Sequence, residues 1–453
     1  MLNSVVRVMD EHFHSVRLAP DRCRGCVSCT KRCPTEAIRI RGGRAQITSS
    51  RCIDCGECIM HCPSRAKVAL TDELADLRNY QYNIALPAPA LYTQFNTGIS
   101  VDAILTGLIR LGFDNVFEVA EGAEIVTLAC KDYLKRREIA RPVISSACPA
   151  VVRLIQVKFP ELIGYLAPFD APVEVAARIA RTEAARLLGL EEDKIGVWFL
   201  TPCPAKMSVI KQPLGSEKSN ITGAIAINKI YNDLLKAIAK DRQSVMSRAS
   251  WLGVGWALSG GETTAIGTDK TLVVNSIHNV IDILEQIALG KLADVDFIEV
   301  LACAGGCIGG PLTVENRHVA EFNMKERLHK KQSANYIANR LPRQTYTEFQ
   351  IGMDRKAIEP KPALRLDEDI DKAMSKIEMM DQIMKRLPGL DCGSCGSPNC
   401  KALAEDIAQG GASETDCVFI LRQRTRDLAL AMVDLAVKLP PSLARSDDSD
   451  DDS

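Results

Sequence analysis

Residues 297–311 read FIEVLACAGGCIGGP, an apolar run of strand length followed by a glycine-rich loop that carries Cys303 and Cys307. A short apolar run of this kind predicts a buried strand. In open α/β sheets, binding sites form in the loops that leave the carboxyl ends of strands. The glycines would allow the backbone to approach a bound group closely. This stretch therefore predicts an α/β fold with a site at the end of a strand.

Two further strand-length runs, 143–144 and 195–200, also lead into cysteines, which are Cys148 and Cys203. Apolar residues recur at helical spacing between these runs, in residues 101–112 and 173–188. Because strand ends of one sheet share an edge, cysteines from distant parts of the chain could converge on one point.

Size and composition narrow the class of protein. With 453 residues the chain should form two or three domains, and its net charge of −1 provides no basic field for nucleic acid or membrane. No stretch approaches the roughly 20 apolar residues of a membrane span, and the N-terminus lacks an apolar signal core. We therefore expect a cytoplasmic protein whose 17 cysteines stay out of disulfides.

Eight cysteines near the N-terminus form two copies of the pattern C-x2-C-x2-C-x3-C-P. This is the two-cluster ferredoxin pattern, in which the fourth cysteine of each copy ligates the other [4Fe–4S] cluster. One predicted ligand set is Cys23, Cys26, Cys29 and Cys62, and the other is Cys52, Cys55, Cys58 and Cys33. Paired zinc sites are the alternative, although zinc motifs lack the third close spacing and the trailing proline.

A last cysteine group lies near the C-terminus and consists of Cys392, Cys395, Cys400 and Cys417. It resembles the small four-cysteine [4Fe–4S] domain appended to redox and sensor proteins, and a zinc ribbon is the alternative. Helices are predicted on either side of it, over residues 366–387 and 418–439. The first carries a stripe of methionine and isoleucine, which we interpret as packing. The Asp-Ser tail over residues 446–453 is predicted to be disordered.

The loops around the middle cysteines resemble the three signature loops of the [FeFe]-hydrogenase catalytic domain. They are SSACP at 145–149, TPCPAK at 201–206 and LACAGGCIGGP at 301–311. The resemblance extends to PAPAL at 87–91, to Phe117-Glu118 and to Gly122-Ala123-Glu124, and covers residues 84 to 316 in family order. Such a likeness implies an α/β catalytic domain behind an α+β ferredoxin-like domain, followed by a mainly helical iron–sulfur domain.

The resemblance also implies roles for individual residues. Cys148, Cys203 and Cys303 would be terminal ligands of a [4Fe–4S] cube, and Cys307 would bridge the cube to a diiron subcluster with CO, cyanide and a dithiolate amine. Lys206 would donate a charge-assisted hydrogen bond to one cyanide. Ala88 and Ala90 would line the other cyanide, although Ala90 lacks the hydroxyl found in fast relatives. Four buried, inert cysteines are the alternative interpretation.

Several positions depart from the fast members of the family. Ala147 stands where those enzymes have a proton-relaying cysteine, and a relay needs titratable groups within hydrogen-bond reach of one another. Cys130, Ala171 and Tyr133 align with the rest of the relay, a glutamate, a serine and a second glutamate. The third loop is one glycine short and lacks the usual Gln-Pro ending. These departures resemble the sensory branch of the family. We hypothesise that Glu262 and Cys130 form a substitute relay.

Four segments follow from these motifs: a ferredoxin-like domain at 1–78, an H-cluster domain at 79–350, a helical four-cysteine domain at 351–440 and an acidic tail at 441–453. The expected function is slow interconversion of H2 with protons and electrons, used for hydrogen or redox sensing. Expected cofactors are an H-cluster, two ferredoxin-type [4Fe–4S] clusters and one C-terminal [4Fe–4S] cluster. The expected redox partner is a ferredoxin or a signalling protein. The sequence leaves open whether the chain forms a homo-oligomer.

Three other functions remain as alternatives. The chain could be a fast metabolic hydrogenase linked to ferredoxin, although Ala147 argues against rapid turnover. It could be a non-catalytic protein of the hydrogenase-like iron–sulfur assembly type, although those relatives typically lack the duplicated ferredoxin motif. It could also be an electron-transfer or regulatory module with a vestigial site.

Overall fold

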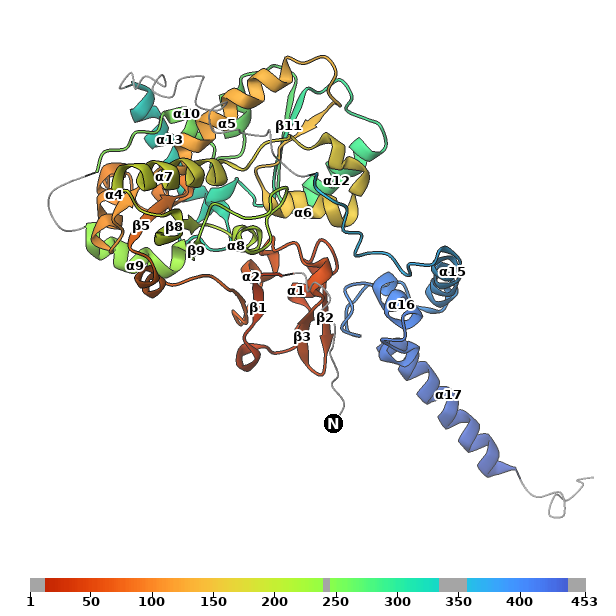
Figure 1. Cartoon of the computed structure of the whole chain (residues 1–453). Coiled ribbons are helices and arrows are strands. Elements are labelled where there is room, and N and C mark those ends of the chain that lie inside the picture. Colours follow the sequence, from red (N-terminus) through yellow and green to blue (C-terminus); the bar gives the residue numbers. More distant parts are fainter. Residues whose placement is uncertain (1–12, 239–244, 334–356, 439–453) are drawn as a thin grey trace, which may run out of the picture.

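The computed structural model describes residues 13–238, 245–333 and 357–438. Its central part is α/β and is built on two small parallel sheets (Figure 1). The first sheet has the order β6 (Asn115–Val116), β5 (Tyr82–Pro87), β8 (Ile195–Thr201) and β9 (Gly223–Ala226). The second has the order β10 (Thr271–Asn275), β11 (Phe297–Leu301) and β7 (Val143–Ile144). The three predicted strands are therefore confirmed, but they are divided between two sheets.

The composition of the strands explains why they lie inside. All seven residues of β8 and all five of β11 are buried, as expected for parallel strands that are covered on both faces. The first sheet is packed by α7 (Pro172–Leu188), and α12 (Ile277–Ala288) packs on the second. Helices α4 (Val101–Arg110) and α7 confirm the two helices predicted from the apolar spacing.

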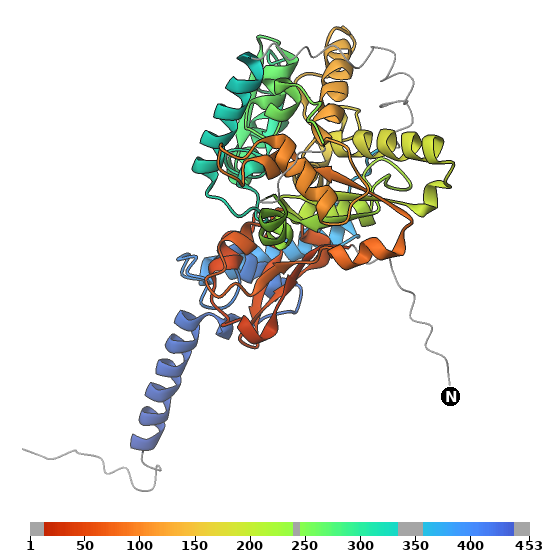
Figure 2. The ribbon, with the colours of Figure 1, turned by 90° about the vertical axis from the view of Figure 1, so that its left-hand side faces the viewer.

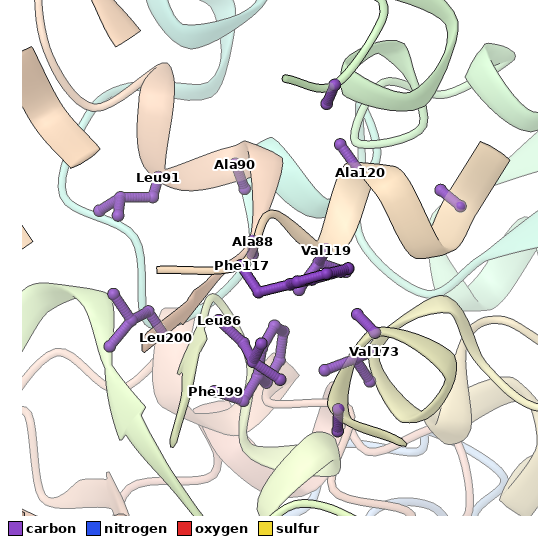
Figure 3. Close-up of a cluster of buried hydrophobic side chains, with 14 of the residues drawn as sticks. Leu86, Ala88, Ala90, Leu91, Phe117, Val119, Ala120, Val173, Phe199 and Leu200 are labelled. Atoms are coloured by element: carbon purple, nitrogen blue, oxygen red, sulfur yellow. The ribbon is translucent and has the colours of Figure 1, made fainter. Parts of the chain in front are cut away.

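Further helices complete the α/β part. They are α3 (Pro89–Tyr92), α5 (Val119–Leu134), α6 (Pro149–Lys158), α8 (Pro204–Lys211), α9 (Ile227–Ile238), α10 (Trp251–Gly255), α11 (Gly261–Ile266) and α13 (Arg317–Ser333). Two buried clusters form its core, one around the first sheet and one around β11, α6 and α12. Figure 3 shows part of the first cluster, including Leu86, Phe117 and Phe199.

The N-terminal unit consists of two antiparallel pairs and two short helices. Strand β1 (Val16–Leu18) pairs with β4 (Lys67–Ala69), and β2 (Ile38–Arg41) pairs with β3 (Arg44–Ile47). The helices α1 (Ser28–Lys31) and α2 (Glu57–Met60) each carry the third cysteine of one motif. Only three residues after β4, Asp72 forms a bridge with Ile225 of β9. The chain therefore reaches the α/β part before residue 78.

The C-terminal unit is helical and consists of α15 (Ile370–Arg386), α16 (Cys400–Ala408) and α17 (Val418–Val437). Helix α15 starts later than the predicted residue 366, because the Asp369 side chain caps it by accepting from the N–H groups of Asp371 and Lys372. In the predicted methionine stripe Ile383 is buried, whereas Ile370 and Met374 are exposed. The stripe therefore packs at its C-terminal end.

Helix α17 projects away from the rest of the molecule in two perpendicular views (Figures 1 and 2). Of the predicted range 418–439 it occupies residues 418–437, and the acidic tail lies outside the described residues. Among the described residues no helix is both long and apolar enough to cross a membrane.

Candidate active site and iron–sulfur centres

A cavity of about 110 Å³ lies at the carboxyl ends of strands from both sheets. It is the place where the loops after β5, β7, β8 and β11 meet. The cavity is lined by every residue to which the sequence assigned a role at the catalytic centre except Cys130: Ala88, Ala90, Cys148, Cys203, Lys206, Glu262, Cys303 and Cys307. The structure thus brings together four cysteines that span 160 residues of chain.

Local structure explains how the four thiols reach the cavity. Cys148 and Cys203 are the N-caps of α6 and α8, and each is followed by a proline at the first helical position. The positive end of a helix dipole favours a thiolate there. Cys303 follows β11, and Cys307 begins a short 3-10 turn after Gly306.

The glycines of the third loop are required by close contacts. Gly306 has a φ of +95°, and a Cβ atom added to it would lie 2.6 Å from the carbonyl oxygen of Ala257. A Cβ on Gly310 would lie 2.4 Å from the carbonyl oxygen of Pro202. Larger side chains at these two positions would push the loop, and with it Cys307, away from its place at the cavity.

The chemistry of the donor set fits a bound iron–sulfur group. All four cysteines are free thiols. Burial, together with the negative charge of neighbouring thiolates, raises the pKa of Cys303 well above its ordinary value and the pKa of Cys307 to about 12. Four thiolates in one buried place repel one another unless cationic metal lies between them, and a [4Fe–4S] cube takes four thiolate ligands.

Lys206 and a group of apolar side chains form the remaining wall. The Lys206 Nζ donates to the carbonyl oxygen of Ala147 over 3.2 Å, so its ammonium lies beside the loop that holds Cys148. Ala88 and Ala90, at the start of α3, are 4% and 0% exposed, and together with Val119 and Val173 they belong to the buried apolar cluster of Figure 3 and line the cavity. The wall is apolar apart from a few polar groups, as in most small-ligand sites.

Glu262 is a buried residue of α11, and its carboxylate accepts a 2.6 Å hydrogen bond from the Ser145 hydroxyl. Burial and the charge of Glu299 raise the pKa of Glu262 to about 8. Cys130 on α5 is also buried, and burial together with the charge of Glu262 raises the pKa of its thiol. Glu262 is therefore a buried helical residue and not a solvated surface glutamate.

Two members of this polar group were missed by the sequence analysis. Ser145 is fully buried one residue after β7, and Glu299 is fully buried in β11, where it accepts from the N–H groups of Gly260 and Thr263 over 2.8 Å each. A glutamate inside the otherwise apolar run FIEVL was the signal that could have revealed Glu299.

The conventional relay positions hold no such network among the residues described. Ala147 lines the cavity with a methyl group. Tyr133 packs edge-on against Phe169, with ring centroids 5.6 Å apart, and Ala171 caps α7 without a side-chain hydrogen bond.

The eight N-terminal thiols fall into two groups. Burial raises the pKa of Cys29, and the charges of Cys26 and Cys62 raise it further. Burial likewise raises the pKa of Cys55, and there the charges that act are those of Cys33, Cys58 and Cys52. Cys33 also lines one small pocket together with Cys52, Cys55 and Cys58 of the second motif. The C-terminal group is packed in its own small core, in which Cys400 and Cys417 are buried.

Comparison with protein families gives three matches. The model described as the C-terminal domain of the iron-only hydrogenase large subunit matches residues 81–268 and 261–311, which together make up about half of the chain. A 4Fe-4S dicluster domain matches residues 15–63, and an Fe-S cluster family matches residues 387–419.

Individual proteins are similar at low identity. The NADP-reducing hydrogenase subunit HndD of Solidesulfovibrio fructosivorans is 23% identical over 350 residues, which are 65% of this chain and 56% of that protein. The chain therefore spans about half the length of this relative. A cytosolic Fe-S cluster assembly factor of Drosophila persimilis is 22% identical, over 63% of this chain and 73% of that protein. A variant of the [FeFe]-hydrogenase HydA1 from Chlamydomonas reinhardtii has a TM-score of 0.48 at 15% identity, covering 64% of this chain and 98% of that one.

Proposed function

The chain belongs to the family of iron-only hydrogenase large subunits, and from this premise we propose that it slowly interconverts H2 with protons and electrons in order to sense hydrogen or redox poise. One observation carries the proposal: four free cysteines and a lysine from distant segments line one buried cavity. A buried inert core would not collect four thiols and an ammonium group at the ends of three strands.

Each cysteine has a place in this proposal. Cys148, Cys203 and Cys303 would hold a [4Fe–4S] cube, and Cys307 would be the ligand that the cube shares with a diiron subcluster. When bound, this assembly would supply an open iron site at which the H–H bond is cleaved, while the protein supplies orientation and electrostatics.

The polar and the apolar side chains that line the cavity have different roles in this proposal. Lys206 would donate a charge-assisted hydrogen bond to an anionic diatomic ligand of the bound cofactor. Its ammonium lines the cavity and is oriented by the hydrogen bond that it donates to the carbonyl oxygen of Ala147. Ala88 and Ala90 would exclude water from their part of the wall, since both are buried. The buried cavity thereby strengthens every electrostatic contact inside it.

Protons would move through Glu262. This carboxyl lines the cavity and accepts a hydrogen bond from Ser145, and its negative charge raises the pKa of the Cys130 thiol. A carboxyl whose pKa is raised to about 8 can hold and release a proton near neutral pH. Ala147 lacks an exchangeable proton on the direct path, which supports slow turnover and hence a sensory use. The electrons would reach a ferredoxin or a signalling protein in the cytoplasm through the accessory clusters.

Loading the protein with a synthetic diiron complex that carries CO and cyanide tests this proposal. The expected result is a set of infrared bands from protein-bound CO and cyanide that shift reversibly when argon is exchanged for H2. A protein that contains its iron–sulfur clusters but takes up no diiron complex would contradict it.

That contrary result would favour a second function, in which the chain is a non-catalytic iron–sulfur protein of the assembly type. The similarity to the assembly factor and the alanine at position 147 support this second candidate. Loading followed by infrared bands that do not respond to H2 would instead support a vestigial catalytic site.

A further inference from the structure

We propose that the C-terminal four-cysteine domain is the outer electron port of the protein. Electrons would pass between the Cys392–Cys417 cluster and the Cys23, Cys26, Cys29 and Cys62 cluster, and then through the Cys52, Cys55, Cys58 and Cys33 cluster to the cavity. This inference rests on the proposed function for its endpoint, but the order of the clusters follows from contacts between the domains.

The inner end of this path is the second ferredoxin motif. A Cβ atom on Gly56 would lie 2.4 Å from the Cγ of Pro311, so this loop lies directly against the end of the third cavity loop. Cys55 packs on the same buried cluster as Cys148 and Cys203. The adjacent Asp54 accepts a 2.6 Å hydrogen bond from Ser208 of α8, the helix that Cys203 caps. The second motif is therefore the one next to the cavity.

The outer end is the first motif, and the four-cysteine domain lies against it. A Cβ atom on Gly393 would lie 3.3 Å from the Cε of Lys31 and 3.5 Å from the Cβ of Val27. Val27 lies between Cys26 and Cys29, and Gly393 follows Cys392. The ligand loops of the two predicted clusters are thus in van der Waals contact, and Figure 1 shows α16 beside β2.

A backbone contact fixes this arrangement. The N–H of Ile40 in β2 donates to the carbonyl oxygen of Gly396 over 2.7 Å, and the Arg41 guanidinium donates to the carbonyl oxygen of Cys395 over 3.2 Å. A Cβ on Gly396 would lie 2.1 Å from the Ile40 carbonyl oxygen, so only glycine permits the approach. The cysteine loop of the C-terminal domain is therefore attached to the edge of a ferredoxin strand.

Charged residues of α16 and of the ferredoxin-like part reinforce the contact. Asp406 of α16 lies 2.7 Å from both the Arg39 Nε and the Arg41 Nη2, and Glu405 forms an ion pair with the buried Arg51. These five side chains are 27% exposed or less. Ion pairs this well shielded hold geometry more firmly than exposed pairs, because solvent and salt screen them less. We name these five residues the clasp.

Electrons would pass one at a time between neighbouring clusters. Each step oxidises one cluster and reduces its neighbour by one electron, and no bond is formed or broken. Oxidation of one H2 would send two electrons outward in succession to a one-electron acceptor protein, while two protons leave from the cavity side. Cys392 is exposed, so an acceptor could approach the outermost cluster.

Electron paramagnetic resonance on the full chain tests the order of the clusters. The protein is loaded with iron and sulfide alone, so that the outcome does not depend on the diiron unit or on H2 turnover. In the fully reduced protein we expect magnetic coupling between the C-terminal cluster and a ferredoxin cluster. Cys26→Ala should abolish this coupling, whereas Cys55→Ala should preserve it. Absence of coupling in the unmodified protein, or the reverse pattern in the two variants, would overturn the proposal.

A second pair of variants covers the case in which a cysteine variant does not fold. Glu405→Gln combined with Asp406→Asn opens the clasp without removing a ligand, and we expect the coupling to be lost while all clusters remain. The control is Glu414→Gln, which removes an ion-pair partner of Arg386 and Arg424 inside the C-terminal domain. Coupling that weakens equally in both proteins would also overturn the proposal. Failure of diiron loading would leave these results unchanged and would count against the proposed function alone.

Discussion

At the scale of single residues, the site places two carboxyl groups close together in a buried environment, where their negative charges would repel each other. Glu262 and Glu299 are two buried carboxyls, and a negative charge on one makes ionisation of the other less favourable. The Ser145 hydroxyl donates a hydrogen bond to Glu262 only. The folded protein can bury both carboxyls because two backbone N–H groups donate hydrogen bonds to Glu299 and stabilise its negative charge. Glu262 is therefore the carboxyl that keeps its proton.

Glu262→Gln should therefore impair proton transfer without emptying the site. Glutamine retains the volume and a hydrogen bond to Ser145 but cannot release a proton, and general acid–base groups contribute about 100-fold or more to rates. We expect H2 oxidation by the matured protein to fall about 100-fold, with the infrared bands of the cofactor retained. Unchanged turnover with an unchanged pH profile would remove Glu262 from the proton route.

The same variant should change how stability depends on pH. The pKa of Glu262 is near 4.5 in the unfolded chain and about 8 in the folded protein, so the folded state binds the extra proton between these values. The contribution of the Glu262 carboxyl to the unfolding free energy is fully present below pH 4.5 and is lost as the pH rises through about 8. The unfolding free energy of the unmodified protein should decline over this window relative to Glu262→Gln. Glu285→Gln, on an exposed carboxylate, is the control and should keep the unmodified slope.

Lys206→Ala should weaken retention of the diiron unit. A hydrogen bond to a charged group is worth about 2 kcal/mol, which corresponds to about 30-fold in binding. Lys211→Ala, at the exposed end of the same helix, serves as the control. Iron content and infrared intensity after loading measure the effect, and equal loading in both variants would argue against a role for Lys206.

At the scale of elements, glycine positions decide which loops can meet. Gly396 and Gly410 both have positive φ values, +84° and +76°, but nothing lies within 4 Å of a Cβ added to Gly410. Only the first of the two is therefore needed for a contact between elements.

Gly396→Ala should consequently cost more than Gly410→Ala. The left-handed conformation alone costs a side chain about 1–2 kcal/mol, which applies to both variants. At Gly396 the added Cβ also collides with the Ile40 carbonyl, so we expect about 2 kcal/mol more and faster proteolysis between α13 and α15. Chemical denaturation and limited proteolysis measure this difference. Equal costs would mean that the β2 contact does not hold the domain in place.

Sequence patterns predicted some elements better than others. Strands β7, β8 and β11 and helices α4 and α7 were predictable, since their apolar spacing is set by burial within each element. The division of the strands between two sheets was not, because pairing depends on contacts between elements far apart in sequence. For the same reason the clasp could not be foreseen: Arg39 and Asp406 are ordinary charged residues until folding places them together.

At the scale of the whole molecule, the three parts form a continuous series from the projecting helix α17 to the cavity. Asp54 joins the ferredoxin-like part to the α/β part, since it accepts from the N–H groups of Ser15 and Val16 and from Ser208. The candidate site was foreseeable in its cysteines because each lies in a loop after a predicted strand, and these loops resemble the signature loops of the family. Ser145 and Glu299 were not foreseen, because their role depends on the cavity that surrounds them.

Crystallography at the iron absorption edge tests the central claim most directly. We predict a strong anomalous peak from an iron assembly in the cavity, bonded to the sulfur atoms of Cys148, Cys203, Cys303 and Cys307, in protein loaded with all its cofactors. A cavity without iron, or a single ion held by some of these cysteines, would contradict the claim that they share one iron–sulfur assembly.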